Sequence, residues 1–519
     1  MIGGKALFYT QTFRHNRAAN SELKSKDEDF IVLTEDDWND YGFETTFWLD
    51  VWKGGEFFEI GLIRILHISK EETRFVIPKE FEELNDDYIS LGYSEKLYKS
   101  ILTVLGRDRA KEVLTKINDI SLVGLEENEK FDIDHKGIQD SFFRSSDGRF
   151  LYSDVKDKYF LDKGSQDRDY NFTFNAKLYP NSENLKEISI DFRKKDEYLP
   201  NRLFTIVGKN GVGKTRLLNQ LAESLFDSSK PENRNRFIDI EKTGTSELDE
   251  KIPIYNKIIA ISFSVFDKFY KGTVDRDLDS RKSDDSEEEQ TKFNNYTYIG
   301  LHKVDNSIYS SNELIEINKR AYKKIIDNER QSLFLESINS SNILNYTLEE
   351  DFKYEDFFTE IFSSGQSIFI SMLCRLLSEI EDGSLIFLDE PELYLHPNAI
   401  ASLARIYYDI LDRFKSYAIL CTHSPILVQE IPSKYVRKML ITDNNTIHYR
   451  PPNIETFGNN ISDITANIFN VLDKESLYKS KLIEWSKNKD LDEDKIMDLF
   501  DNQLSLKTQL YLASLFEGE

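Results

Sequence analysis

The feature that most constrains the fold is a glycine-rich loop between an apolar strand and an amphipathic helix. Residues 208–215 read Gly-Lys-Asn-Gly-Val-Gly-Lys-Thr. Residues 203–207 before the loop carry no charge, as in a buried strand, and residues 217–222 after it have the composition of a helix. A strand, a Gly-x4-Gly-Lys-Thr loop and a helix in this order predict a phosphate-binding loop at the edge of an α/β sheet.

The loop sequence also predicts what its residues do. We expect Lys214 to bridge the β- and γ-phosphates of a nucleotide, and the Thr215 hydroxyl to bind Mg²⁺. Backbone N–H groups of such a loop wrap the phosphates, and the helix dipole favours their negative charge. The further residues expected to contact ATP are Asn210, Gly211, Gly213 and Arg216.

Two adjacent acids end a second uncharged run. Residues 384–388 are uncharged, and Asp389-Glu390 follow directly. Such carboxylates can simply be solvated at a strand end, but a phosphate-binding loop in the same chain favours a catalytic role. We expect Asp389 to bind Mg²⁺ and Glu390 to polarise the attacking water.

A third apolar run, at residues 417–421, ends in Thr422-His423-Ser424. A single histidine at a strand end is usually structural. However, parallel α/β sheets bind ligands at the carboxyl ends of their strands. We therefore expect His423 to contact the γ-phosphate.

The fourth segment, Phe362-Ser363-Ser364-Gly365-Gln366, precedes an amphipathic helix. Ser363, Ser364, Gly365 and Gln366 can form an ordinary helix cap, or they can offer donors to a phosphate. The position of the segment between the phosphate loop and the Asp-Glu pair favours the phosphate. Because the segment cannot easily reach a nucleotide in its own subunit, we expect ATP to join a homodimer or a higher even oligomer.

The overall charge limits the choice of partners. The chain has 67 Lys and Arg against 92 Asp and Glu, a formal charge of −25. This excludes a surface that is basic all over, although it allows a local basic groove. With only two cysteines, Cys374 and Cys421, the chain has no disulfide framework. No apolar run reaches the roughly 20 residues of a membrane span, so we expect a cytoplasmic protein without membrane contact.

The region before the loop is expected to combine strands and helices. Residues 45–52 and 57–63 are rich in aromatic and β-branched side chains and flank Gly54-Gly55, a pattern that predicts a β-hairpin. Helical spacing follows at 97–105 and 110–117.

Closer to the loop and beyond it, the pattern changes. Residues 172–178 and 188–192 alternate like strands and are expected to begin the nucleotide-binding sheet. The acidic segment 275–291 is expected to be a mobile loop. A helix is predicted at 313–325. Its basic cluster could touch nucleic acid but is better explained as a solvated helix face; the cluster is Lys319, Arg320, Lys323 and Lys324.

Together the four segments resemble the ABC-type ATPase head shared by RecF-like, SMC-like and OLD-family proteins. In that comparison, residues 362–366 correspond to the signature motif, with Ser364 where a glycine is usual, and residues 391–397 correspond to the D-loop. The resemblance implies two subunits that enclose two nucleotides. It fails at the Q-loop, because residues 259–267 contain no glutamine. Ser264 and Asp267 are the candidates for sensing the metal there. The chain lacks the sustained heptads of long-armed relatives.

A closer resemblance, to the ATPase subunit of Septu antiphage systems and related retron-associated ATPases, rests on less specific segments. These are the region before the loop and residues 262–267, 298–301 and 456–461. The resemblance implies a separate HNH-type nuclease partner, and DNA or tRNA as candidate ligands of the complex.

We therefore expect an α/β protein with an ABC-type head and a mixed, mostly parallel sheet. The expected parts are a β-rich and helical N-terminal region (1–170), the head (171–470) with a helical insertion at about 268–355, and a helical C-terminal segment (471–519).

Three functions compete. The first is an ATPase, with slow, regulatory turnover, whose ATP-dependent dimerisation controls a nuclease. The second is a DNA-repair ATPase that clamps DNA itself. The third is an OLD-like ATPase-nuclease, for which only Asp492 and Asp494 offer an acidic motif and too few residues follow His423.

Overall fold

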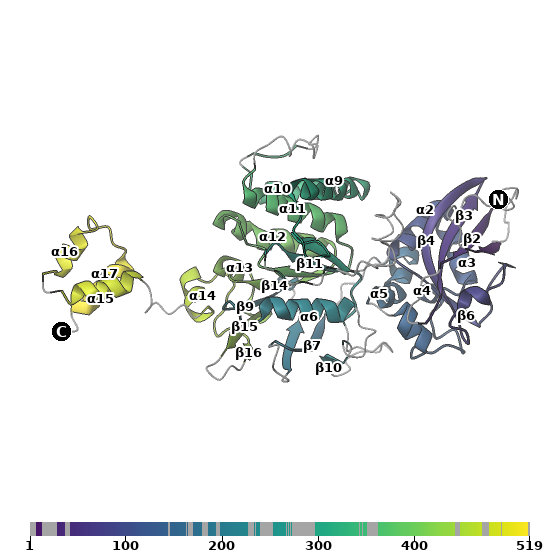
Figure 1. The fold of residues 1–519 in the computed structure, drawn as a ribbon, viewed down its shortest axis with the longest axis horizontal. Coiled ribbons are helices and arrows are strands. Elements are labelled where there is room, and N and C mark those ends of the chain that lie inside the picture. The colour runs from purple at the N-terminus through teal and green to yellow at the C-terminus, as the bar shows by residue number, and fades with distance from the viewer. Residues whose placement is uncertain are drawn as a thin grey trace.

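The computed structural model describes the larger part of the chain and contains distinct hydrophobic cores. One core runs from Phe8 to Phe160, a second from Tyr170 to Phe469, and a small third one comprises Leu482, Ile496 and Leu512. Each belongs to a separate group of elements (Figure 1). The acidic segment expected at 275–291 lies outside the described residues. Those residues are 7–12, 29–36, 42–143, 146–161, 163, 170–178, 185–193, 198–226, 233, 235–238, 253–265, 267, 269, 271, 296–341, 343–344, 346–349, 362–441, 447–469, 477–488 and 490–516.

The N-terminal part is a six-stranded sheet in the order β5-β1-β2-β3-β4-β6. The predicted hairpin is confirmed: β3 and β4 pair antiparallel, and Gly54 and Gly55 both have the positive φ that a tight hairpin turn needs. The strands are β1 (Phe8–Gln11), β2 (Phe30–Glu35), β3 (Thr46–Lys53), β4 (Glu56–His67), β5 (Glu80–Phe81) and β6 (Tyr88–Gly92).

Helices pack on this sheet, and both predicted ones are present. They correspond to α2 (Glu95–Leu105) and α3 (Arg107–Lys116). The remaining helical elements are η2 (Thr73–Phe75), α4 (Ile120–Val123), η3 (Ile138–Phe142), α5 (Ser146–Val155) and η4 (Lys156–Phe160).

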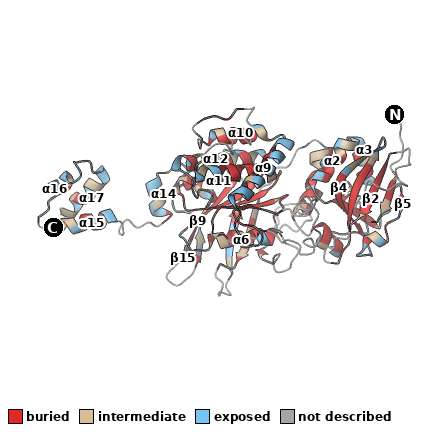
Figure 2. Cartoon of the chain, turned by 45° about the horizontal axis from the view of Figure 1, so that its top comes forward, coloured by how far each residue is buried: buried red, intermediate tan, exposed pale blue. Residues whose placement is uncertain are grey.

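The central part is built on a seven-stranded sheet in the order β12-β11-β13-β14-β9-β15-β16. All neighbours are parallel except the edge pair β15 and β16. The inner strands are buried along their whole length, because helices cover both faces (Figure 2). The predicted mixed α/β sheet is therefore confirmed. Its strands are β9 (Leu203–Gly208), β11 (Ile258–Ser262), β12 (Tyr296–Gly300), β13 (Leu385–Asp389), β14 (Tyr417–Thr422), β15 (Val436–Ile441) and β16 (Ile447–Arg450).

The helices of the central part include the predicted insertion. The helix expected at 313–325 is present as α9, which begins at a Ser310–Glu313 capping box. The helices are α6 (Lys214–Phe226), α9 (Ser311–Asp327), α10 (Gln331–Ser340), α11 (Ser364–Glu379), α12 (Pro397–Arg413), α13 (Pro425–Gln429), η6 (Ser433–Tyr435) and α14 (Ile461–Asn467).

One strand assignment was wrong. β7 (Asn171–Ala176) and β8 (Lys186–Asp191) do not begin the nucleotide-binding sheet but form a separate antiparallel sheet with β10 (Phe237–Ile238). Buried and partly exposed residues alternate along β7, as in a strand with only one covered face. Helix α6 contacts strands of both sheets.

The C-terminal part consists of α15 (Leu477–Ser486), α16 (Glu493–Asp498) and α17 (Leu506–Phe516). These helices enclose the small third core. Across the described residues, no helix combines the length and the apolar character needed to cross a membrane.

Candidate nucleotide site

The candidate site lies at the carboxyl ends of β9, β13 and β14, which are neighbours in the central sheet. The strand register aligns Asp389 with Cys421, and Thr422 with Val207. Consequently the phosphate loop after β9, the acids at the end of β13 and His423 after β14 meet at one edge, where parallel sheets bind ligands.

The backbone of the loop depends on its glycines. Gly211 and Gly213 have φ angles of 80° and 99°, which residues with a side chain rarely adopt. Gly208 lies against β15, because a Cβ there would come 2.5 Å from the Met439 carbonyl oxygen. Val212 is buried and anchors the loop, whereas Asn210 is exposed.

Lys214, the first residue of α6, points into the site. Its side chain is buried, and Nζ donates a hydrogen bond to the Gly208 carbonyl oxygen at 3.1 Å. The same Nζ lies 2.5 Å from His423 Nε2. Burial lowers the pKa of Lys214. A buried ammonium group beside exposed loop backbone can bind a phosphate anion strongly.

Thr215 and Asp389 form a pair suited to Mg²⁺. The Thr215 hydroxyl donates to Asp389 Oδ2 at 2.8 Å, and Asp389 Oδ1 is buried without a hydrogen-bond partner in the described residues. Burial raises the pKa of Asp389 to about 6, and the charge of Glu390 adds to the rise. A buried acceptor without a partner is costly unless something binds it. A hydroxyl and a carboxylate, completed by substrate phosphates and water, are typical Mg²⁺ ligands.

Glu390 turns the chain sharply after β13. Its φ is 48°, an unusual value for a non-glycine residue, and its N–H donates to the Cys421 carbonyl oxygen at 2.9 Å. Its Oε1 lies 3.2 Å from His423 Nε2, and this contact lowers the pKa of Glu390. An ionised carboxylate can polarise a water molecule.

Glu392 is a site residue that the sequence reasoning missed. Its Oε1 accepts hydrogen bonds from the Thr422 hydroxyl and, at 3.1 Å, from the His423 N–H. Its Oε2 is buried without a partner among the described residues, and burial raises the pKa of Glu392. This carboxyl holds the turn that carries His423. A third acid only two residues after Glu390 was the available signal.

The segment 362–366 forms a helix cap. The Ser363 hydroxyl accepts from Gln366 N–H at 3.3 Å, and Gln366 Oε1 accepts from Ser363 N–H at 2.9 Å. Gln366 also donates to the Ile343 carbonyl oxygen at 2.8 Å. Gly365 lets the Tyr394 carbonyl oxygen approach so closely that a Cβ would overlap with it. Contact between this segment and a nucleotide of another subunit stays a prediction.

The two candidates for sensing the metal have different surroundings. Asp267 is fully buried and lies 3.3 Å from Lys271 Nζ and 3.4 Å from His302 Nδ1. The Tyr298 hydroxyl donates to the same carboxylate. Ser264 is only partly buried. The charge of Asp267 adds to the raised pKa of Asp389, after burial and the charge of Glu390. Which of the two residues senses a metal ion stays a prediction.

A family comparison covers this site. Residues 203–429 match the family described as "AAA domain, putative AbiEii toxin, Type IV TA system". The matched range begins at β9 and ends at α13, so it includes all four segments. The match supports an AAA-type domain over these residues.

Other similarities extend further along the chain or concern solved structures. The chain is 27% identical over 525 residues to Protein ea59 of Escherichia phage lambda, covering 93% of this chain and 94% of that protein. A putative metal-chelate-type ABC transporter in an inward-facing conformation aligns with a TM-score of 0.26 and 18% identity, covering 55% of this chain and 84% of that one. CbiO1 of Clostridium perfringens, part of the ABC transporter complex cbiONQ, aligns with a TM-score of 0.26 and 15% identity, covering 52% and 84%.

The structure brings five of the residues predicted from sequence together at this candidate site. Residues 363–366 make their hydrogen bonds elsewhere in the described chain. Arg216 is partly buried on α6. The five are Lys214, Thr215, Asp389, Glu390 and His423.

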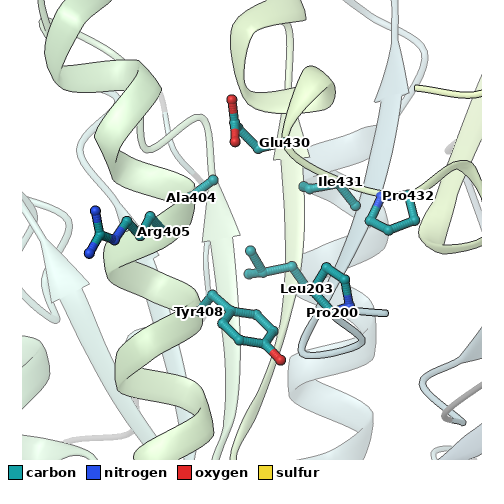
Figure 3. Close-up of a pocket in the computed structure, with 8 residues that line it drawn as sticks. All are labelled: Pro200, Leu203, Ala404, Arg405, Tyr408, Glu430, Ile431 and Pro432. Atoms are coloured by element: carbon teal, nitrogen blue, oxygen red, sulfur yellow. The ribbon is translucent and has the colours of Figure 1, made fainter. Parts of the chain in front are cut away.

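A pocket of about 170 Å³ lies away from the site (Figure 3). It includes Leu203, at the start of β9, whereas the phosphate loop follows the end of that strand. Its lining is largely apolar and contains none of the predicted site residues. The residues that line it are Pro200, Leu203, Ala404, Arg405, Tyr408, Glu430, Ile431 and Pro432.

Proposed function

We propose that this chain is an ABC-type ATPase subunit that binds ATP with Mg²⁺, hydrolyses it, and dimerises around the nucleotide. One observation carries the proposal: Lys214, His423 and Glu390 converge within hydrogen-bond distance beside a Thr215–Asp389 pair that leaves one buried carboxylate oxygen free. These groups supply an ammonium group and an imidazole for phosphate, ligands for a metal ion, and a carboxylate for water.

Each of these site residues has its own role in ATP hydrolysis. Thr215 and Asp389 would hold Mg²⁺, which neutralises phosphate charge when bound. Lys214 and His423 bind the γ-phosphate. Glu390 accepts a proton from the water whose oxygen bonds to the γ-phosphorus. The bond from that phosphorus to the β–γ bridging oxygen breaks, so ADP leaves with the electron pair and inorganic phosphate forms.

The test of ATP chemistry is a comparison of two lysine variants. Lys214→Ala removes the buried ammonium group, so we expect both ATP affinity and phosphate release to be lost. Lys487→Ala, at an exposed lysine near the end of the C-terminal α15, is the control and should match the parent. Binding is measured by calorimetry and turnover by phosphate release. Full ATP binding by Lys214→Ala would contradict the proposal.

For the biological role, we propose that the chain belongs to an antiphage defence complex in which binding and hydrolysis of ATP control a separate HNH-type nuclease. The support is the resemblance to Septu and retron-associated ATPases, and the phage lambda relative adds no stated activity. A tagged chain expressed with its neighbouring genes should copurify with an HNH-type nuclease and restrict phage growth. Absence of a nuclease, together with unchanged phage growth, would refute this role.

The alternatives have weaker support. In the basic cluster on α9, Lys319 pairs with Glu316 and Lys324 with Glu379, each at 2.8 Å, so at least two of its four positive charges are already paired within the chain. The acidic motif of an OLD-like nuclease would include Asp492. Its side chain instead caps α16, where it accepts a hydrogen bond from the Lys495 N–H at 2.8 Å. In the described part of the chain, no group of three or more His, Cys, Asp and Glu side chains could hold a metal ion. Tight DNA binding with a steep salt dependence by the isolated protein would favour the clamp.

A further inference from the structure

The C-terminal unit, which we define as residues 477–516 with helices α15 to α17, has a very small hydrophobic core. Only three of its described side chains form that buried core. Folded units of about 40 residues or fewer usually need disulfides, metal ions or association with another surface to be stable. Both cysteines lie elsewhere, at Cys374 and Cys421. Across the described residues, no group of three or more His, Cys, Asp and Glu side chains could hold a metal ion. Association would supply the burial that the unit lacks by itself.

Exposed apolar side chains are concentrated in this unit. Among the described residues, six of the nineteen large apolar side chains that are exposed belong to it. Leu506 and Leu510 are 70% and 64% exposed, and they lie one turn apart on the same face of α17. The six are Leu477, Tyr478, Leu499, Phe500, Leu506 and Leu510. Such a concentration of exposed apolar surface marks an interaction site.

The first two helices of the unit lie in segments of opposite charge. Residues 477–489, which include α15, contain four lysines and one acid. Residues 490–501, which include α16, contain six acids and one lysine. Asp494 and Asp498 are exposed and lie one turn apart on α16. A surface that binds both segments must therefore be acidic opposite α15 and basic opposite α16.

A second copy of the same unit meets this requirement. If a two-fold axis relates two copies, α15 of each copy can lie beside α16 of the other, and both contacts then join opposite charges. The same axis brings the apolar faces of the two units together. We propose that α15–α17 form a self-complementary contact with the same helices of a second copy, with Leu506 and Leu510 at its apolar centre.

This contact is weak by itself. A patch centred on two leucines is far smaller than the roughly 800 Å² that each partner buries in a standard stable interface. The chain without nucleotide therefore stays monomeric at low micromolar concentration. Once ATP joins the central parts of two copies, their C-terminal units meet at an effective concentration on the order of millimolar. The strengthening by ATP, unlike the contact itself, rests on the proposed function.

Sedimentation equilibrium of the full chain tests the contact. Without nucleotide, the parent should associate reversibly to a dimer as its concentration approaches the millimolar range, whereas Leu506→Gln/Leu510→Gln should stay monomeric. In a Glu390→Gln background with Mg·ATP, the two leucine substitutions should weaken the dimer at least about tenfold. Phe75→Gln is the matched control, because Phe75 is 69% exposed in the N-terminal part. It should leave both association constants unchanged.

An exchange of charge identifies the second copy as the partner. In the same background, Lys479→Glu/Lys481→Glu and Asp494→Lys/Asp498→Lys each place like charges at both contacts of a homodimer. Each double variant alone should therefore form a weaker Mg·ATP dimer than the parent. In a one-to-one mixture of the two, both contacts of the mixed dimer again join opposite charges, so the affinity should recover towards that of the parent. Chains that had merely lost their fold would not recover on mixing.

Each outcome decides between the contact and the proposed ATP dimer. Equal Mg·ATP dimer affinity with and without the leucine substitutions would overturn the contact and leave the ATP dimer standing. A weaker dimer in the leucine variant without recovery in the charge-exchanged mixture would place a different surface against the leucines, and would also overturn the contact. If the parent associates at high concentration through the leucines but Mg·ATP adds nothing, the contact stands and the ATP dimer fails.

Discussion

At the scale of single residues, the two adjacent acids of the site have different environments. Burial raises the pKa of Asp389 to about 6, whereas His423 lowers that of Glu390. Such a separation lets neighbouring carboxylates take different roles. The sequence predicted both acids and His423 because a motif specifies them. It did not predict Glu392, because the partners of Glu392 lie on another strand.

Glu392 should act on catalysis through His423. Glu392→Ala leaves the Thr422 hydroxyl and the His423 N–H without an acceptor. An unmatched buried donor costs about 1–3 kcal/mol, so we expect ATP turnover to fall on the order of 10- to 100-fold. Glu392→Gln keeps an acceptor oxygen and should retain most activity. Steady-state kcat and KM of both variants provide the measurement. Equal turnover in the alanine variant and the parent would refute the role.

Asp119 should make stability depend on pH. This buried residue accepts hydrogen bonds from Tyr98 and Ser121, and burial raises its pKa to about 6. The folded chain then binds more protons than the unfolded chain above pH 4, so stability falls as pH rises through 6. Between pH 5.5 and 7.5 the loss is about 1 kcal/mol.

Asp119→Asn keeps an oxygen acceptor for the Ser121 N–H but does not titrate. We therefore expect the parent to lose more thermal stability than the variant between these pH values. Scanning calorimetry at both pH values measures the difference. Parallel pH profiles of Tm would contradict the assignment.

At the scale of elements, local pattern predicted the strands that end in the site, the helix after the loop and the N-terminal hairpin. These elements have an uninterrupted apolar run, helical spacing or a Gly-Gly turn. The pattern of β7 and β8 correctly indicated strands but assigned them to the wrong sheet. Which sheet a strand joins depends on partners distant in sequence, such as β10, and its own residues do not specify them.

At Gly365, the start of α11 packs closely against the turn at residues 391–396, and a substitution there tests whether this close approach stabilises the fold. The Tyr394 backbone occupies the place of a Cβ on Gly365, so Gly365→Ala must displace the 391–396 turn from the start of α11. We expect a loss of about 1–3 kcal/mol in stability. Ser367→Ala, at an exposed position on the same helix, should cause no loss. Thermal unfolding measures the stability of both variants. Equal Tm values for Gly365→Ala and Ser367→Ala would show that the turn moves without loss of stability and would contradict the prediction.

At the scale of the whole molecule, the N-terminal part contacts the central part at the turn between α11 and β13. Lys158 Nζ lies 2.7 Å from Glu95 Oε1 and 2.7 Å from Asp382 Oδ2. Asp382 lies in the turn between the end of α11, which begins at the signature-like segment, and the start of β13, which ends at Asp389. A Cβ on the neighbouring Gly383 would come 2.6 Å from the Phe150 ring. Residues so far apart in sequence give no local signal of this contact.

Lys158→Met should weaken the connection between the two parts. It keeps the length of the side chain but leaves the buried Glu95 without this partner, and breaking a buried pair costs about 3–5 kcal/mol. Lys99, at 3.3 Å from Glu95, compensates in part, so the lower end of that range is expected. Adding Glu95→Gln should recover part of the loss. Calorimetry and limited proteolysis between the two parts measure the effect; unchanged behaviour would contradict it.

The central claim is that ATP joins two copies of this chain, and Glu390→Gln tests it most directly. This variant should bind ATP without hydrolysing it. In sedimentation with Mg·ATP we expect twice the 60.7 kDa of the chain, and a monomer without nucleotide. Adding Ser363→Arg should restore the monomer while ATP affinity persists. A Glu390→Gln protein that binds ATP and still sediments at 60.7 kDa would contradict the account.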